Sequence, residues 1–302
     1  MSFRNAKVMN LTGVHHHDLG DKALVDLYHE TLQKGMHGLC FSPYEMGQKP
    51  GDQLSKAQVE RRIQVIRPHT QWVRSFSCTD GNELIAQVAK AHGMKTLVGA
   101  WLGNDPEINQ REIEGLIRLA KAGLVDIAAV GNEVMYRGDL TEAALLKLIN
   151  QVRQALPTDI PVGYVDAYYE FAERPKITEA CDVILANCYP FWEGCHCDYS
   201  LPYMKDMYHQ AVNAGRGKKV IITETGWPSQ GSSLHGAEPS VANFMKYFIN
   251  TQQWAQAEGI EVFYFSSFDE SWKVGDEGDV GAYWGLWTED EKPKFAPASV
   301  AI

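Results

Sequence analysis

The sequence predicts a single α/β domain folded as a (β/α)8 TIM barrel. Eight strand-like runs alternate with helical segments at roughly thirty residues per unit, the usual length of a strand–helix–strand unit. The runs are continuously apolar, as is typical of parallel strands covered on both faces. The 302 residues suit one such barrel, and no change of composition marks a second domain. We therefore assign 1–302 to one domain, with an N-terminal extension and helix at 1–36, the barrel at 37–296 and a tail at 297–302.

Each predicted strand is rich in Val, Ile or aromatic residues and ends at a Gly, a Pro or a polar residue. The eight runs lie at 38–44, 72–77, 95–102, 125–134, 160–165, 181–189, within 220–229, and at 261–268. A doubly wound open sheet is the alternative fold, and it calls for a Gly-rich turn after the first strand. The residues that follow that strand, Pro-Tyr-Glu-Met-Gly at 43–47, do not form such a turn, which favours the barrel.

The intervening segments have apolar residues at helical spacing and recognisable ends. Ser55 with Gln58 has the form of a capping box, Pro106 suits a first helical turn, and Gly123 suits a helix end. The predicted helices lie at 21–34, 55–67, 82–91, 106–123, 141–152, 204–214 and 240–258. The first of them precedes the first strand, and we expect it to close one end of the domain.

Two of the apolar strands deliver a carboxylate at their ends. Glu224 follows a run of β-branched residues and is itself followed by Gly226 and Pro228, which end the strand. A lone buried Glu is costly unless it is paired, and pairing with an Arg or Lys is its ordinary explanation. However, Glu133 stands in the same way at the end of the fourth strand. Because the carboxyl ends of barrel strands share one face, the two acids predict acid–base chemistry there.

Other polar and aromatic side chains are expected at the same face. They are Tyr44, Arg74, Trp101, Asn132, Asp166, Tyr168, Tyr189, Trp192, Trp227, Glu270 and Lys273. Aromatic rings offer flat apolar faces to the C–H bonds of a sugar, and carboxylates and amides bind its hydroxyls. This set of residues therefore favours a carbohydrate site. Trp284 is expected either to form a sugar platform or to plug the end of the barrel.

The charge and the composition narrow the partners. A formal net charge of −10 argues against nucleic acid and against anionic membranes, and it leaves neutral substrates open. No run reaches the ~18 apolar residues of a spanning helix. The first twenty residues include His15, His16 and His17 and lack an apolar signal core, so we expect a cytosolic protein or a trimmed mature form.

Six cysteines are present, at positions 40, 78, 181, 188, 195 and 197. Four of them lie in apolar strand-like runs, where small buried thiols are common. Cys195-His196-Cys197 is the one cluster, and its spacing matches none of the usual zinc patterns. We expect a loop with free thiols or a loop disulfide there, and no metal.

Several motifs resemble those of one family. Val-Gly-Asn-Glu-Val at 130–134 and Ile-Thr-Glu-Thr-Gly-Trp-Pro-Ser at 222–229 resemble the acid/base and nucleophile signatures of glycoside hydrolase family 17. That family contains β-1,3-glucanases and related glucanosyltransferases. Asn-Cys-Tyr-Pro-Phe-Trp at 187–192 is similar to its sixth-strand motif. The segments 265–273 and 283–287 resemble its eighth strand and following loop in the bacterial and fungal branches, and we expect a bacterial-like member.

The resemblance implies roles for the matching positions. Glu133 would be the general acid/base and Glu224 the nucleophile of a retaining glycosidase, whose two carboxyl groups lie about 5–5.5 Å apart. Tyr189 and Arg74 would hold Glu224 in position. Asn132 would bond the 2-hydroxyl of the sugar under attack. The pair would be supported by Glu270 and Lys273.

The resemblance thus predicts an enzyme that hydrolyses β-1,3-glucan by double displacement, without cofactor or metal, as a monomer. Transfer of the glucan to another sugar by the same two Glu is an open alternative. A non-catalytic glucan-binding barrel is less favoured, because both carboxylates are present. The family is usually extracellular or periplasmic. The N-terminal helix, the histidine run and the Cys195–Cys197 loop have no counterpart in the family pattern.

Overall fold

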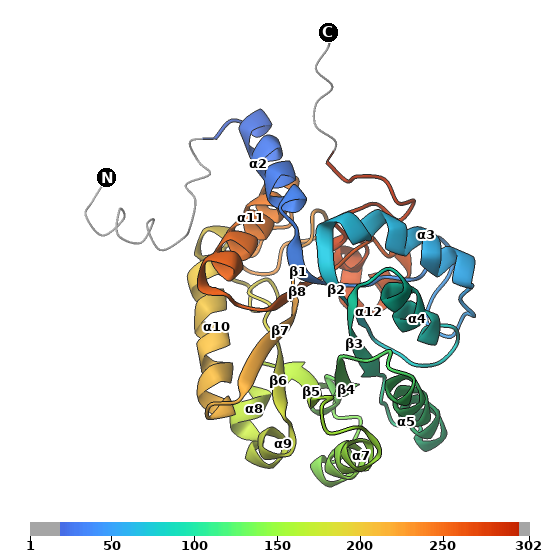
Figure 1. Ribbon diagram of the computed structural model, residues 1–302. Coiled ribbons are helices and arrows are strands. Elements are labelled where there is room, and N and C mark those ends of the chain that lie inside the picture. Colours follow the sequence, from blue (N-terminus) through green and yellow to red (C-terminus); the bar gives the residue numbers. More distant parts are fainter. Residues whose placement is uncertain (1–18, 296–302) are drawn as a thin grey trace.

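Eight parallel strands close into a barrel, in which each strand pairs with the next along the chain and β8 returns to β1 (Figure 1). This computed structural model describes residues 19–295. The strands are β1 (Met36–Cys40), β2 (Thr70–Ser75), β3 (Lys95–Ala100), β4 (Ile127–Asn132), β5 (Val162–Ala167), β6 (Val183–Asn187), β7 (Lys219–Thr225) and β8 (Val262–Tyr264). The predicted fold class is confirmed, and the strands lie inside the predicted runs or within two residues of them.

The strands are buried on both faces, which explains their continuously apolar sequences. Every residue of β4 and of β6 is buried. Where the barrel closes, Gly38 of β1 lies opposite Phe263 of β8. A Cβ at Gly38 would lie 2.4 Å from the Phe263 ring, so glycine leaves the space that this ring fills. Short apolar strands and a ring at the closure thus form the packed interior of the barrel.

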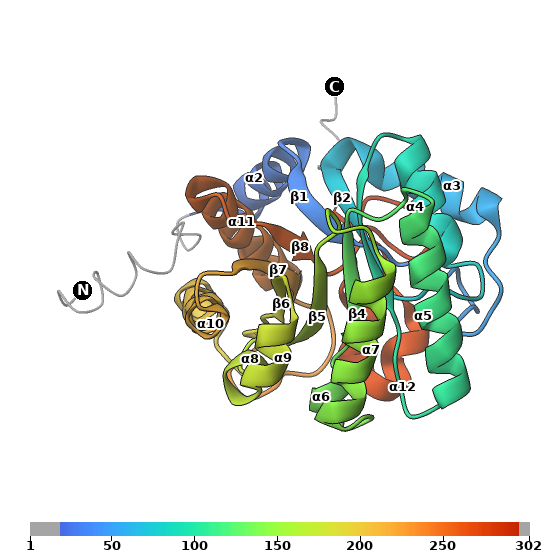
Figure 2. The same cartoon turned by 60° about the horizontal axis from the view of Figure 1, so that its bottom comes forward.

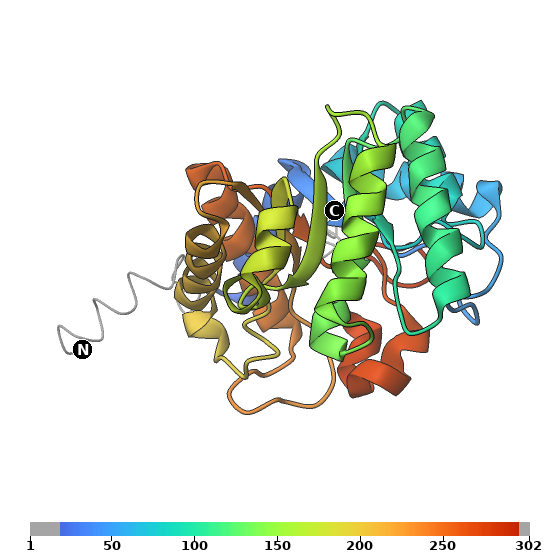
Figure 3. The same cartoon turned by 90° about the horizontal axis from the view of Figure 1, so that it is seen from below.

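Helices surround the barrel in chain order (Figures 2 and 3). The longer ones are α2 (Asp21–Gln33), α3 (Lys56–Ile66), α4 (Glu83–Ala91), α5 (Pro106–Lys121), α7 (Glu142–Ala155), α10 (Ser200–Gly215) and α11 (Val241–Glu258). Short helices follow several strands: α6 (Val134–Arg137), α8 (Glu170–Glu173), α9 (Pro175–Ala180) and α12 (Val274–Glu277). The predicted N-cap at Ser55 is present, and its side chain accepts a hydrogen bond from the Gln58 amide.

The helix before the first strand, α2, has a different place from the one predicted. Its buried Tyr28 packs against Phe244 and Phe248 of α11, with ring centroids 6.4 and 5.2 Å apart. The helix therefore lies along the side of the barrel, between α11 and α3, and does not close an end (Figure 1). After β8 the described chain forms only short helical turns, so α2 covers the side that a helix after β8 covers in a regular barrel.

Three remaining expectations concern the termini and the cysteines. The His15–His17 run and the tail at 297–302 lie outside the described residues. Between residues 19 and 295, no helix combines the length and the apolar character that a membrane crossing requires. All six cysteines are free, so the Cys195–Cys197 loop carries thiols and not a disulfide.

Candidate active site

A cavity of about 600 Å³ opens at the carboxyl ends of β4 to β8. It is lined by Glu133, Tyr136, Ala167, Tyr168, Tyr169, Asn187, Tyr189, Trp192, Glu193, Glu224, Phe265, Glu277 and Trp284. Both predicted carboxylates thus face one space, together with seven aromatic side chains. In Figure 2 the short helices α6 and α12, which follow β4 and β8, both lie on the lower side of the barrel.

Glu224 is buried near the end of β7 and has two donors. The guanidinium of Arg74, from β2, donates through Nη1 to its Oε1 at 2.6 Å. The hydroxyl of Tyr189 donates to its Oε2 at 2.8 Å. Burial raises the pKa of Tyr189 well above its ordinary value, and the charge of Glu224 adds to this, so Tyr189 keeps its proton and remains a donor. Each carboxylate oxygen is therefore held in a fixed direction by a charged or a neutral donor.

Arg74 connects the nucleophile candidate to the neighbouring strands. The same Nη1 donates to the Thr223 carbonyl at 2.9 Å, and Nη2 donates to Asn132 Oδ1 at 2.7 Å. The guanidinium also lies 4.2 Å from the centroid of the Phe76 ring. The bond to Oδ1 fixes the orientation of the Asn132 side-chain amide, whose Nδ2 is its donor group.

Glu133 stands just beyond β4, where the chain turns sharply into α6. Its φ is +52°, in the left-handed region that non-glycine residues rarely adopt and that clusters at functional sites. Asn187 Nδ2, from β6, donates to its Oε1 at 2.8 Å. Burial, and then the charge of Glu224, raises the pKa of Glu133 to about 7, while the Asn187 bond and Arg137 act in the lowering direction. Glu133 can thus hold a proton near neutral pH.

A second ion pair lies beside the cavity. Lys273 Nζ is 2.7 Å from Glu270 Oε2, and both side chains are buried. Burial opposes the charge of Lys273, but Glu270 and Glu277 outweigh it, so the pKa of Lys273 is raised. The ammonium lies 4.1 Å from the centroid of the Phe265 ring, which lines the cavity. The pair therefore packs against a ring of the cavity wall without lining the cavity itself.

Aromatic rings form most of the cavity wall. Trp284 is buried and packs edge-on against Tyr189, with ring centroids 5.6 Å apart. Trp192 is 41% exposed and tilts against Trp284. Tyr168 lies on the β5 side, and its hydroxyl donates to Glu193 Oε1 at 3.2 Å. Trp284 thus belongs both to the packed end of the barrel and to the cavity wall.

Three predicted site residues, Trp101, Trp227 and Tyr44, do not line the cavity. Trp101 is 40% exposed, and the guanidinium of Arg137 lies 4.7 Å from the centroid of its ring. Trp227 is fully buried between Phe191 and Tyr247, and its indole nitrogen donates to the Glu238 carbonyl at 3.0 Å. It packs as a core side chain and not as a wall of the cavity. Tyr44 is buried against Trp272, and its hydroxyl accepts a hydrogen bond from Nδ2 of the Asn82 side chain.

The structure adds residues that the sequence analysis did not assign to the site. Asn187 begins the motif at 187–192, and the structure shows that its side-chain amide is the donor to Glu133. Tyr136, Tyr169, Glu193, Phe265 and Glu277 also line the cavity. Tyr136, Tyr169 and Phe265 follow a strand end closely, which was the available signal, but polar and aromatic residues are common in loops. Glu193 and Glu277 come later in their loops, where the sequence offers no such signal. Among the described residues, no group of three His, Cys, Asp or Glu side chains is arranged to hold a metal ion.

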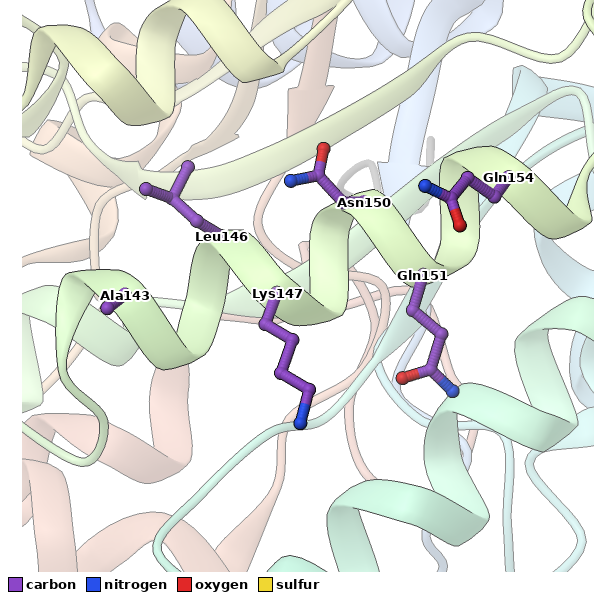
Figure 4. A pocket seen from close by; sticks show the side chains of 6 residues that line it. All are labelled: Ala143, Leu146, Lys147, Asn150, Gln151 and Gln154. Atoms are coloured by element: carbon purple, nitrogen blue, oxygen red, sulfur yellow. The ribbon is translucent and has the colours of Figure 1, made fainter.

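A second hollow, of about 680 Å³, lies against α7 and is lined by Ala143, Leu146, Lys147, Asn150, Gln151 and Gln154 (Figure 4). These side chains all come from one helix and include no ring or carboxylate. The cavity at the strand ends is therefore the candidate active site. It combines a carboxyl group that can give up a proton with a carboxylate whose charge Arg74 compensates, as cleavage of a glycosidic bond requires.

Comparison with known proteins agrees with this chemistry. Residues 38–285 match the family model described as the BtgE/BtgC glycoside hydrolase domain. A glucan 1,3-beta-glucosidase of Arthroderma benhamiae is 30% identical over 278 residues, which cover 83% of this chain and 88% of that protein. A glucan 1,3-beta-glucosidase of Saccharomyces cerevisiae is 28% identical over 280 residues, with 84% and 89% covered.

The crystal structure of a glycoside hydrolase family 17 β-1,3-glucanosyltransferase from Rhizomucor miehei is also similar. Its TM-score is 0.78 at 29% sequence identity, and the match covers 87% of this chain and 96% of that chain. These three relatives come from fungi, and they leave the predicted bacterial-like branch untested.

Proposed function

The chain belongs to the BtgE/BtgC glycoside hydrolase domain family, and from this premise we propose that it cleaves β-1,3-glucan with retention of configuration. The observation that carries the proposal is the pair of carboxyl groups in one cavity with unequal surroundings. Glu224 is bound by a cation and a phenol, whereas Glu133 is bound by a neutral amide and lies near other acids. The names of the curated relatives support β-1,3-glucan as the substrate.

In the first step, Glu224 attacks the anomeric carbon as the bond to the leaving oxygen breaks. Glu133 gives its proton to that oxygen, which leaves as a neutral hydroxyl. A pKa of about 7 keeps a useful fraction of Glu133 protonated at neutral pH. Arg74 and Tyr189 each hold one oxygen of the Glu224 carboxylate, which lines the cavity.

In the second step, the glycosyl ester on Glu224 is cleaved by water. Ester formation removes the negative charge of Glu224, which is one of the causes that raise the pKa of Glu133. Glu133 then takes a proton from the attacking water and returns to its starting state. In this proposal the Asn132 side-chain amide donates through Nδ2 to the sugar; its oxygen accepts from Arg74, which supports this orientation.

Transfer to a second glucan is the competing outcome of the same intermediate. It is favoured by the similarity to the Rhizomucor miehei enzyme, which is a glucanosyltransferase. Exposed rings at the cavity, such as Trp192, offer a face on which an acceptor sugar can stack. Hydrolysis and transfer differ only in whether water or a sugar hydroxyl removes the glycosyl group from Glu224.

The test is incubation with laminari-oligosaccharides of defined length, with the products separated by size. Shorter products alone would establish hydrolysis, and products longer than the substrate would establish transfer. The Glu224→Gln protein serves as the inactive control. If the protein without substitutions changes no β-glucan, both hydrolysis and transfer are ruled out.

A further inference from the structure

The turn that carries Glu133 has an unusual arrangement of its helix cap. Glu133 occupies the N-cap position of α6, the four-residue helix that follows β4. An N-cap side chain ordinarily accepts hydrogen bonds from the amides two and three residues ahead. Glu133 makes no such bond, and its carboxylate is instead bonded to Asn187 in the cavity. Another group must therefore satisfy those amides.

That group is Asp166 of the neighbouring strand β5, whose side chain is fully buried. Its Oδ2 accepts from the Met135 amide at 3.2 Å and from the Tyr136 amide at 3.3 Å. These are the second and third residues of α6. The Tyr164 hydroxyl donates to the same oxygen and accepts from the Met135 amide at 2.9 Å. Oδ1 accepts from the Ala167 amide at 2.8 Å, so both carboxylate oxygens are engaged.

We propose that Asp166 is a positioning residue for the acid/base group: it caps α6 in place of Glu133 and so leaves the Glu133 carboxyl free to face the glycosidic bond. The inference rests on the proposed role of Glu133. The backbone supports it, because the left-handed turn at Glu133 directs the side chain away from the amides of α6. The amide of Glu133 itself donates to the Val165 carbonyl, next to Asp166, at 2.8 Å. Strand β5 thus holds the turn on both sides.

Asp166 also contributes charge. Glu133 is faced by Glu224 from β7, Asn187 from β6, Arg137 from α6 and Asp166 from β5. Asp166 is faced by Tyr164 of its own strand, by the Tyr136 amide of α6, and by Glu170 of α8. The ion pair of Glu170 with Arg174 adds a cation on that side. Burial raises the pKa of Asp166 to about 6, so its carboxylate is largely ionised at pH 7 and above, where its charge raises the pKa of Glu133.

The test compares Asp166→Ala and Asp166→Asn with two substrates. Laminaritriose has a poor alcohol leaving group and needs proton donation. A 2,4-dinitrophenyl β-laminaribioside has a leaving group that departs without it. We expect Asp166→Ala to lower kcat/KM about 10- to 100-fold on laminaritriose and at most a few-fold on the aryl substrate. Asp166→Asn keeps an oxygen for the α6 amides, so it should recover most of the loss.

The two effects of Asp166 separate in the pH profile. Removing the charge in Asp166→Asn lowers the pKa of Glu133, so the basic limb of kcat/KM should move to lower pH. The matched control is Asp126→Asn, because Asp126 accepts from the Thr96 amide at 2.7 Å before β4, at the amino end of the barrel. This control should leave the substrate ratio and the basic limb unchanged.

The inference is overturned if folded Asp166 variants lose activity equally on both substrates, or if the basic limb of Asp166→Asn stays at the wild-type pH. Should Asp166→Ala fail to fold, Asp166→Asn decides by its pH profile alone. Glu133→Ala is measured in parallel. If Glu133→Ala keeps its activity on laminaritriose, the proposed function fails. If Glu133→Ala loses activity but both Asp166 variants behave like wild type, the inference about Asp166 fails and the acid/base role of Glu133 stands.

Discussion

The two carboxyl groups of the cavity are the same kind of side chain in two different settings. Glu224 lies within a strand and is bound by a guanidinium and a phenol. Glu133 lies beyond a strand, in a left-handed turn, and its donor is the uncharged amide of Asn187. One setting compensates a negative charge, and the other disfavours it. The difference shows how two Glu residues take different roles in one reaction, because the role depends on the neighbours.

Replacing the nucleophile should have the largest effect. Glu224→Gln keeps the size of the side chain but removes the attacking charge, so we expect kcat to fall by more than about 10⁴-fold. Turnover of laminaritriose is the measurement, and Glu107→Gln, at an exposed position of α5, is the matched control. Near-normal turnover of Glu224→Gln would show that Glu224 is not the nucleophile. The contrast between the surroundings of Glu224 and Glu133 would then have no catalytic meaning.

Replacing the acid/base group should cost less and should be reversible. We expect Glu133→Ala to lose about 10²- to 10⁴-fold in kcat/KM on laminaritriose, which needs proton donation. On an activated aryl glycoside, added azide should restore turnover, because a small anion attacks the glycosyl ester without a general base. A β-glycosyl azide among the products would show that azide attacked the glycosyl ester on Glu224. Absence of rescue in a folded Glu133→Ala protein would contradict the assignment.

The third prediction concerns Arg74, the cation bound to Glu224. Arg74→Met leaves Glu224 buried without its partner, and we expect the free energy of unfolding to fall by about 3–5 kcal/mol. We expect kcat to fall by about 10²- to 10³-fold, because the carboxylate loses its orientation. Urea unfolding and steady-state kinetics measure the two effects.

Arg153→Met is the control for that cation, since the Arg153–Asp182 pair is exposed. It should cost less than about 1 kcal/mol and leave kcat unchanged. Equal destabilisation by the two substitutions would show that burial of the Arg74 pair has no special importance.

The smallest predicted effect concerns the side-chain amide of Asn187, which donates to Glu133. The Asn187 hydrogen bond acts to lower the pKa of Glu133, so Asn187→Ala should raise that pKa above about 7. The basic limb of kcat/KM should then move to higher pH, with a loss of about 10-fold or less at pH 6. The comparison is with Asp166→Asn, for which the opposite direction is expected. A basic limb that moves the same way in both variants would show that neither group acts on Glu133 directly.

The predictable parts of the molecule are those whose signals are local in the chain. The eight strands and most of the helices follow from apolar runs, helical spacing and Gly, Pro or Ser at the ends. Glu133 and Glu224 were recognised because an acid that ends a buried strand is conspicuous. The connection between β5 and β6 gives no helical signal in the sequence, because α8 and α9 are too short to show a helical period.

The cavity was less predictable, because an aromatic residue after a strand can face either way. Trp227 closely follows the end of β7, and Trp284 lies in the long segment after β8. Trp284 lines the cavity, whereas Trp227 packs between two rings of the core. Likewise, the apolar stripe of α2 predicted a helix correctly but did not reveal α11 as its partner.

The sequence by itself determined the barrel, the order of its strands and the two acids at their carboxyl ends. The spacing of apolar residues and the Gly and Pro residues that end elements are signals carried by residues close together in the chain. The tertiary structure alone decided that Glu133 meets Asn187, which comes from a strand 54 residues away, whereas the contact of Arg74 with Glu224 was already implied by the family resemblance. It also decided that Asp166 caps the helix after Glu133, leaving the acid free. Contacts of this kind depend on strand register and barrel closure, which bring distant residues within hydrogen-bonding distance only in the folded chain.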